Sequence, residues 1–324
     1  MLYPLVFQPI FKERVWGGRE LERLFAKPLP AGKTIGESWE IADRPGDASV
    51  VSSGALAGKN LRWLMETYPR EILGSARPSA KGYFPILCKI LDARDKLSLQ
   101  VHPPAARAAE PHGEPKTEMW FIANAAPGAE LYVGLKFGVT RAEFDQRIAD
   151  GTVADCFHRV AVRAGDAMFL PSGRVHAIGA GIVIFEIQQN SDTTYRVFDW
   201  NRVGLDGKPR ALHVEESLAS INFNDFEPRL VQSMFSVDGP SRSRPIVRDP
   251  LFNVDCLELK SGARVRLEGR KLQILAVVRG GLTVKSGADA VILAAGQFCL
   301  LPAELDKTEL AANADTSLLR VEAN

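Results

Sequence analysis

Residues 165–202 read GDAMFLPSGRVHAIGAGIVIFEIQQNSDTTYRVFDWNR, and this stretch decides the fold. It consists of short apolar runs, rich in β-branched residues, that end at glycine or proline. Pro171 cannot donate to a sheet ladder and Gly173 permits a positive φ, so we expect a tight turn between two strands. His176 begins the second of these strands. The pattern therefore predicts antiparallel strands that hold a histidine where the mouth of a small β-barrel binds a ligand.

The spacing around this turn resembles the second cupin motif. Gly165, Pro171, Gly173 and His176 stand at the distances of that motif, although Ala180 replaces the asparagine that often follows. Cupins are jelly-roll barrels that commonly hold a metal between two such motifs. The resemblance implies a mainly β fold of the same kind.

Composition sets the class of protein. The 324 residues are 46% hydrophobic and 24% charged, with a formal net charge of +1, so nothing favours a nucleic acid or a membrane surface as a partner. The chain begins without a signal-peptide pattern, and no apolar run approaches the roughly 20 residues of a membrane helix. The four cysteines are far apart and predict small buried side chains in a reducing compartment. We expect a cytoplasmic protein.

A change in character near residue 230 predicts two domains. We expect residues 1–232 to form a catalytic β domain with helical insertions, with one helix pattern at 56–73 and a short helix opening at 15–21. Further helix patterns occupy residues 140–150 and 212–222.

The last part of the chain contains a partial internal repeat. Gly296 and Pro302 repeat the spacing of Gly165 and Pro171, but the second glycine and the histidine are missing. We therefore expect residues 233–324 to form a second, degenerate cupin-type jelly-roll barrel without metal ligands.

Three residues of the first domain are candidate metal ligands: His102, Glu118 and His176. Side chains repeat every two residues along a strand, which puts Gln100 on the same face as His102. A His, His, Glu set suits zinc, iron or manganese and leaves room for water or substrate. Single histidines in strands are more often structural, but His102 and His176 each stand in a motif that ends at a proline or glycine.

Several motifs, taken in order, resemble the type I mannose-6-phosphate isomerase family in its shorter bacterial form. They are VWGG (15–18), GESWEI (36–41), LAGK (56–59), FPILCKILDA (84–93), QVHP (100–103), KTEMW (116–120) and NSDTTYRVFDWNR (190–202). The resemblance implies isomerisation between mannose 6-phosphate and fructose 6-phosphate through a cis-enediol(ate). It also implies one Zn²⁺ per chain, held by His102, Glu118, His176 and Gln100.

The same resemblance implies roles in catalysis. Arg196 matches a catalytic residue of the family, and a guanidinium suits an enediolate because it stays protonated. Lys116 and Asp192 are the candidates for proton handling. Asp192 is equally suited to orienting Arg196 from four residues away.

The candidates for binding the phosphate, by family position, are Lys89, Ser98 and Arg202. Lys89 lies inside an apolar strand, where a lysine is costly unless it has an anionic partner. The alternatives are that Lys89 reaches the rim of the barrel and that Arg202 is a surface residue. We expect a sugar phosphate as the partner and a monomer or weak homodimer.

Two other functions are compatible with these motifs. A metal-dependent cupin oxygenase would use iron on the same His, His, Glu set. A non-catalytic cupin would bind a sugar phosphate without turnover. Lys116, Arg196 and the phosphate candidates favour the isomerase over the oxygenase.

Overall fold

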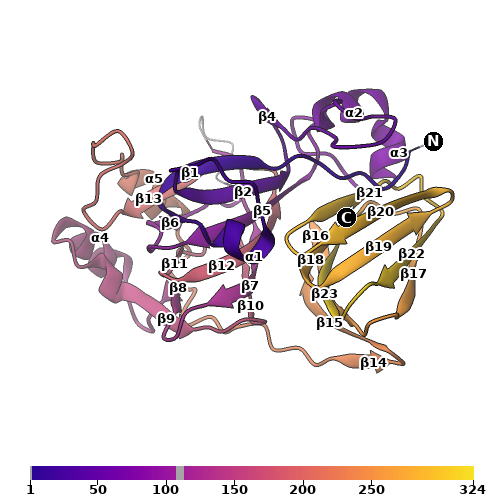
Figure 1. The fold of residues 1–324 in the computed structure, drawn as a ribbon. Helices are drawn as coiled ribbons and strands as arrows, with labels where there is room; N and C mark the ends of the chain where they lie inside the picture. Colours follow the sequence, from indigo (N-terminus) through magenta and orange to yellow (C-terminus); the bar gives the residue numbers. More distant parts are fainter. Residues whose placement is uncertain (1, 107–112) are drawn as a thin grey trace.

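The computed structural model describes residues 2–106 and 113–324, and these residues are mainly β, as predicted (Figure 1). Two of the sheets form a first pair. The larger sheet runs in the order β1 (Ile10–Gly18), β2 (Ile35–Ile41), β5 (Ile86–Ala93), β12 (Ile182–Gln189), β7 (Glu118–Ala125), β10 (Ala167–Leu170). The smaller runs in the order β13 (Tyr195–Phe198), β6 (Leu99–Val101), β11 (His176–Ile178), β8 (Glu130–Leu135), β9 (Phe157–Ala161).

Two further sheets form a second pair, at the C-terminal end of the chain. The larger sheet runs β14 (Ser236–Asp238), β15 (Ser241–Arg248), β16 (Phe252–Leu259), β23 (Thr316–Ala323), β18 (Gln273–Arg279), β21 (Phe298–Leu301). The smaller runs β17 (Arg264–Glu268), β22 (Lys307–Ala312), β19 (Gly281–Ser286), β20 (Asp289–Ala294). Every strand pairing in both pairs is antiparallel, which fits the short runs separated by turns.

Helices cover the outside of the first pair and the junction between the pairs (Figure 1). They are α1 (Glu20–Phe25), α2 (Leu61–Thr67), α3 (Pro69–Leu73), α4 (Arg141–Ala149) and α5 (Val214–Ser220). A short hairpin, β3 (Asp43–Arg44) with β4 (Asp47–Ala48), and a 3₁₀ turn at Val153–Cys156 complete the elements. The helix pattern at 140–150 is confirmed, and Thr140 caps α4 because its Oγ1 accepts from the backbone N–H of Glu143 at 3.2 Å.

Apolar side chains fill three layers within and between the sheet pairs, and a further apolar cluster joins the five-stranded sheet to α4, α5 and the 3₁₀ turn. One layer lies inside each sheet pair, between its two sheets. A third lies between the pairs, where the two six-stranded sheets pack against each other. In this third layer Phe185 stacks on Phe298 with 5.5 Å between ring centroids. β5 is therefore buried on both faces, and this explains why FPILCKILDA reads as one continuous apolar run.

Two helix predictions are wrong in detail. Residues 15–18 continue β1, and the helix begins only at Glu20. The extended form prevails because β1 pairs closely with β2: a Cβ on Gly17 would lie 2.4 Å from the backbone nitrogen of Gly36. The pattern at 56–73 forms two helices, because Asn60 caps the first at its start and Pro69 starts the second.

The chain start belongs to both pairs. Leu5 exchanges two backbone hydrogen bonds of 2.8 Å with Leu300 of β21. A domain boundary near residue 232 remains a prediction, since the apolar layer between the pairs joins them. The four cysteines are buried and unpaired, as expected. Among the described residues, no helix has the length and apolar character needed to cross a bilayer.

The layer between the pairs predicts a large loss of stability on truncation. Phe185→Ala removes a fully buried ring that packs on Phe298 and Phe25, so we expect it to lower the free energy of unfolding by about 3–5 kcal/mol. Phe137→Ala is the matched control, because Phe137 is 81% exposed and its loss should change stability by only about 0.5 kcal/mol. Urea unfolding measures both variants, and equal losses would contradict the packing described.

Candidate active site

The register of the six-stranded sheet brings charged side chains into one layer. Lys89 of β5 stands opposite Trp39 of β2 on one side and Glu186 of β12 on the other. Glu186 in turn stands opposite Trp120 of β7. In the next inward-facing row, Glu118 stands opposite Gln188. Because side chains alternate, these residues all point between the two sheets of the first pair.

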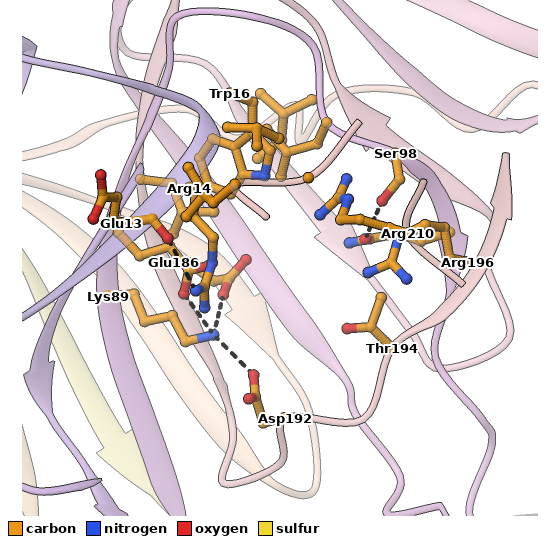
Figure 2. A pocket seen from close by; sticks show the side chains of 18 of the residues that line it. Glu13, Arg14, Trp16, Lys89, Ser98, Glu186, Asp192, Thr194, Arg196 and Arg210 are labelled. Atoms are coloured by element: carbon orange, nitrogen blue, oxygen red, sulfur yellow. Dashed lines mark hydrogen bonds and ion pairs between the residues drawn. The ribbon is translucent and has the colours of Figure 1, made fainter. Parts of the chain in front are cut away.

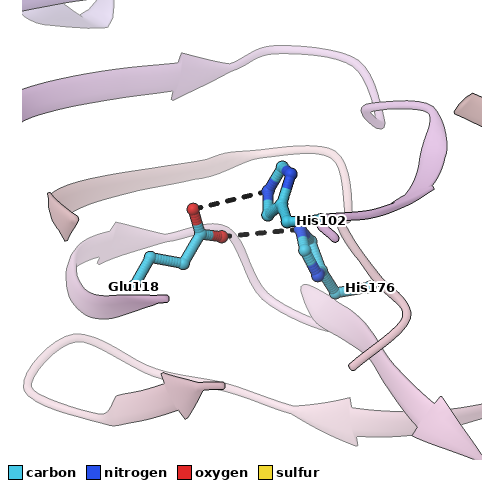
Figure 3. Close-up of side chains that lie close together, drawn as sticks. All are labelled: His102, Glu118 and His176. Atoms are coloured by element: carbon cyan, nitrogen blue, oxygen red, sulfur yellow. Dashed lines mark ion pairs between the residues drawn. The ribbon is translucent and has the colours of Figure 1, made fainter. Parts of the chain in front are cut away.

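The three predicted metal ligands come together at the end of this layer (Figure 3). His102 Nε2 lies 3.5 Å from Glu118 Oε2, and His176 Nε2 lies 3.4 Å from Glu118 Oε1. All three side chains are buried, and one ligand atom from each lies within 4.8 Å of the others. Three separate elements supply them: the end of β6, the start of β7 and the start of β11.

Each histidine ring is held by a backbone carbonyl. His102 Nδ1 lies 2.8 Å from the carbonyl oxygen of Thr193, and His176 Nδ1 lies 2.9 Å from that of Arg174. A carbonyl can only accept, so each Nδ1 carries the proton and each Nε2 presents a lone pair toward Glu118. Histidines that bind a metal through one ring nitrogen typically donate a hydrogen bond from the other, as Nδ1 does here.

Burial keeps both rings neutral. Burial and the nearby Lys116 ammonium lower the pKa of His102 to about 3. Burial also lowers the pKa of His176. Glu118 behaves in the opposite way: burial alone would raise its pKa, but the Lys116 ammonium lowers it well below the usual value. The group thus offers two neutral imidazoles and one carboxylate.

The buried carboxylate of Glu118 has too few neighbouring donors and cations to balance its charge. Neither oxygen of Glu118 receives a hydrogen bond of good geometry from the described residues. Lys116 supplies the adjacent positive charge, with Nζ 2.6 Å from Glu118 Oε2 and 3.1 Å from His102 Nε2. Two imidazole lone pairs and a carboxylate without donors fit a divalent cation of the zinc type.

Gln100 lies beside this group, as its strand face predicted. Its Nε2 is 3.3 Å from His176 Nε2, and its Oε1 accepts from Ser98 Oγ at 3.3 Å. The amide oxygen and nitrogen would exchange places on a half-turn of the amide. Gln100 is therefore within reach as a neutral fourth donor.

The ligand group adjoins a cavity of about 540 Å³. One end of the cavity is a network of ion pairs around Lys89, which is buried (Figure 2). Lys89 Nζ lies 3.5 Å from Glu186, 3.7 Å from Glu37 and 3.9 Å from Asp192. The prediction that Lys89 needs an anionic partner is met by three carboxylates of the protein itself.

The other end of the cavity carries two guanidinium groups. Arg196 and Arg210 lie there with Ser98 and Thr194 (Figure 2). Arg196 Nη1 donates to the carbonyl of Ala211 at 2.8 Å, whereas its buried Nε has no acceptor among the described residues. Burial and repulsion by Arg210 lower the pKa of Arg196. Arg210 donates from Nε and Nη2 to Asp199, so the free Nε of Arg196, beside a second cation, is what favours an anion at this end.

Two predicted residues make contacts that the sequence did not indicate, and their roles stay predictions. Arg202 does not line the cavity: it pairs with Asp199 at 2.9 Å and donates to the backbone carbonyl of Lys96. Asp192 does line it and approaches Lys89, and no ion pair joins it to Arg196 among the described residues. Lys116 and Ser98 line the cavity as expected.

Several cavity residues were not predicted from the sequence. Glu186 accepts a hydrogen bond from Trp120 Nε1 at 2.8 Å, and burial together with Glu118 raises its pKa. The sequence does contain an indication of Glu186, because it is a lone carboxylate in the apolar strand IVIFEIQQ, just as Lys89 is a lone cation in an apolar strand. Arg210 gave no such signal, because it follows a turn that folds back through a bridge between Val203 and Pro209.

Comparison with known proteins agrees with the motifs. Residues 5–119 match the model of the phosphomannose isomerase type I catalytic domain. A mannose-6-phosphate isomerase of Streptococcus mutans is 36% identical over 303 residues, or 93% of each chain. A probable mannose-6-phosphate isomerase of Bacillus subtilis is 42% identical over 223 residues, 68% of this chain and 69% of that protein.

A solved structure agrees over the full length. The crystal structure of a mannose 6-phosphate isomerase from Bacillus subtilis superposes with a TM-score of 0.90 at 28% identity, and 99% of each chain is covered. The second sheet pair, for which the motifs gave little signal, is thus part of the shared fold. The chain belongs to the type I phosphomannose isomerase family.

Proposed function

We propose that this protein interconverts mannose 6-phosphate and fructose 6-phosphate. The observation that carries the proposal is the buried His102, Glu118 and His176 group, which contacts the cavity through Gln100 and Lys116, two residues that line it. Full-length similarity to proteins named mannose-6-phosphate isomerase supports the substrate.

His102, Glu118 and His176 would hold one Zn²⁺, with Gln100 as the fourth donor from the protein. When bound, the ion supplies a Lewis acid that polarises a substrate oxygen and stabilises negative charge on it. The two neutral rings and the single carboxylate leave the ion a net positive charge, which this chemistry requires.

The phosphate would bind at the guanidinium end. Arg196 and Arg210 offer a pair of charged donors there, and Ser98 adds a hydroxyl. Lys89 is a poor candidate because three carboxylates already surround it. Arg210 takes the role that family position assigned to Arg202. The sugar chain would then reach from this end toward the ligand group, with C1 and C2 farthest from the phosphate.

The proton transfer between C2 and C1 would take place at the opposite end of the cavity, around Lys89 and Glu186. Burial and the Glu118 carboxylate raise the pKa of Glu186, which is the direction that suits a carboxyl that gives and takes a proton. Lys89, Lys116 and Asp192 border the same space. Glu118 and Glu186 raise the pKa of Lys116 although burial opposes them, so Lys116 would stay charged and stabilise an enediolate.

We further propose that both sheet pairs are cupin-type jelly-roll barrels, with residues 1–232 as the catalytic domain and residues 233–324 as a domain without metal. The apolar layer inside the second pair supports this. That layer consists mainly of leucine and valine side chains.

Metal dependence is the first test. A coupled assay that follows fructose 6-phosphate from mannose 6-phosphate should show turnover that a chelator abolishes and added Zn²⁺ restores. His176→Ala should not recover with zinc, because one of the two imidazole donors is gone. No turnover by the zinc-loaded protein would reject the isomerase. Oxygen consumption with ferrous iron would then indicate the oxygenase.

The phosphate assignment predicts a contrast between two arginines. Arg210→Met should raise KM for mannose 6-phosphate about 10- to 100-fold, the effect of losing a charged hydrogen bond, with a much smaller effect on free mannose. Arg202→Met should raise KM less, because Arg202 does not line the cavity and affects phosphate binding only by holding a nearby loop. Equal effects of Arg210→Met on both substrates would contradict the assignment.

Lys89 offers a separate test of the division of the cavity. Lys89→Met should lower kcat roughly 10²-fold, because it removes the cation beside Glu186 and Asp192. KM for mannose 6-phosphate should change much less. A large rise in KM with kcat unchanged would return Lys89 to the phosphate site.

A further inference from the structure

The metal ligand His102 is oriented by a residue far away in the sequence. Its ring donates from Nδ1 to the backbone carbonyl of Thr193 at 2.8 Å. The other two ligands have local support: His176 donates to Arg174, two residues before it, and Glu118 sits in the ladder of β7. His102 follows the end of β6, so its ring depends on where the segment after β12 places one carbonyl group.

That segment has no ladder of its own. Residues 190–194 lie between β12 and β13, and Asp192 within them is about half exposed. Without other contacts, the carbonyl of Thr193 would be free to turn away from the ring. Backbone freedom of this kind is removed by side chains that bond to the neighbouring chain.

Two hydroxyl groups supply those bonds. Thr193 Oγ1 accepts from the backbone N–H of Glu114 at 3.0 Å. Ser191 Oγ donates to the backbone carbonyl of Glu114 at 3.2 Å and accepts from the backbone N–H of Thr193 at 3.2 Å. Together the hydroxyls replace a missing pair of strand hydrogen bonds between residue 114 and residues 191–193.

Glu114, whose backbone the two hydroxyls bind, is itself held in place. The carboxylate of Glu114 pairs with Arg44 at 2.7 Å and with Lys81 at 2.8 Å. The hydrogen bonds of Ser191 and Thr193 are therefore anchored outside the ligand group. They act on the ring of His102 through the carbonyl of Thr193.

We propose that Ser191 and Thr193 are positioning residues for the metal ligand His102. Their hydroxyls hold the carbonyl of Thr193 where it accepts from Nδ1, and this keeps the Nε2 lone pair aimed at the ion. The proposal rests on the metal site of the proposed function. The hydrogen bonds of both hydroxyls go to the backbone of residues 114 and 193 and not to the ligand group.

The test compares Thr193→Val with Thr193→Ser. Valine keeps the shape of threonine but has no hydroxyl, whereas serine keeps the hydroxyl. Competition with a chelating dye should give a dissociation constant for Zn²⁺ about 10-fold higher in Thr193→Val, the effect typical of lost partners behind a ligand. Thr193→Ser should bind zinc like the wild type. Ser191→Ala should weaken binding in the same direction and serves as the second variant.

A control separates this effect from general destabilisation. Val284→Ala loses a fully buried side chain of the second sheet pair, so it should lower the melting temperature but leave zinc affinity unchanged. Equal zinc affinity of Thr193→Val and Thr193→Ser would overturn the inference while the metal site stands. A wild-type protein that binds no zinc, or whose binding survives His102→Ala, would overturn the metal site and the inference together.

Discussion

The site depends on one buried carboxylate, Glu118, whose oxygens receive no hydrogen bond of good geometry from the described residues. Glu118 is fully enclosed, and a charge in such a place is stable only beside cations. Lys116 provides one, and two imidazoles held in the neutral form leave room for a second. The sheet register, the carbonyls behind the rings and the ordered segment after β12 all serve this one requirement.

The balance of opposite charges also organises the cavity. At one end, carboxylates and lysines neutralise each other at distances of 3.5–3.9 Å, so the wall is polar but nearly balanced. At the other end, Arg210 pairs with Asp199, which also pairs with Arg202, and Arg196 forms no ion pair with the described residues. A substrate with a phosphate at one end and a reacting carbonyl at the other matches this division, and it can bind productively in one direction only.

Much of this could be predicted from sequence because it is local. Alternation along a strand puts Gln100 and His102 on one face, and the turn at Pro171 marks the start of the strand that carries His176. Lys89 stood out because a charge in an apolar strand needs a partner. Its partners could not be named, since they depend on the register between β2, β5 and β12.

What the sequence did not indicate depended on contacts between distant segments. Residues 15–18 are extended because β2 needs a partner, not because of their own preference. Arg210 reaches the cavity through a folded-back turn, and Arg202 is drawn to Asp199 instead. The role of Thr193 rests on a backbone carbonyl, which no side-chain pattern reveals.

X-ray absorption at the zinc edge of the protein loaded with one equivalent of Zn²⁺ tests the central claim most directly. We expect two imidazole nitrogens and oxygen ligands at about 2.0–2.2 Å. No sulfur should appear, because all four cysteines lie apart from the ligand group. A sulfur shell at about 2.3 Å, or fewer than two imidazoles, would show that zinc binds elsewhere and would contradict the account.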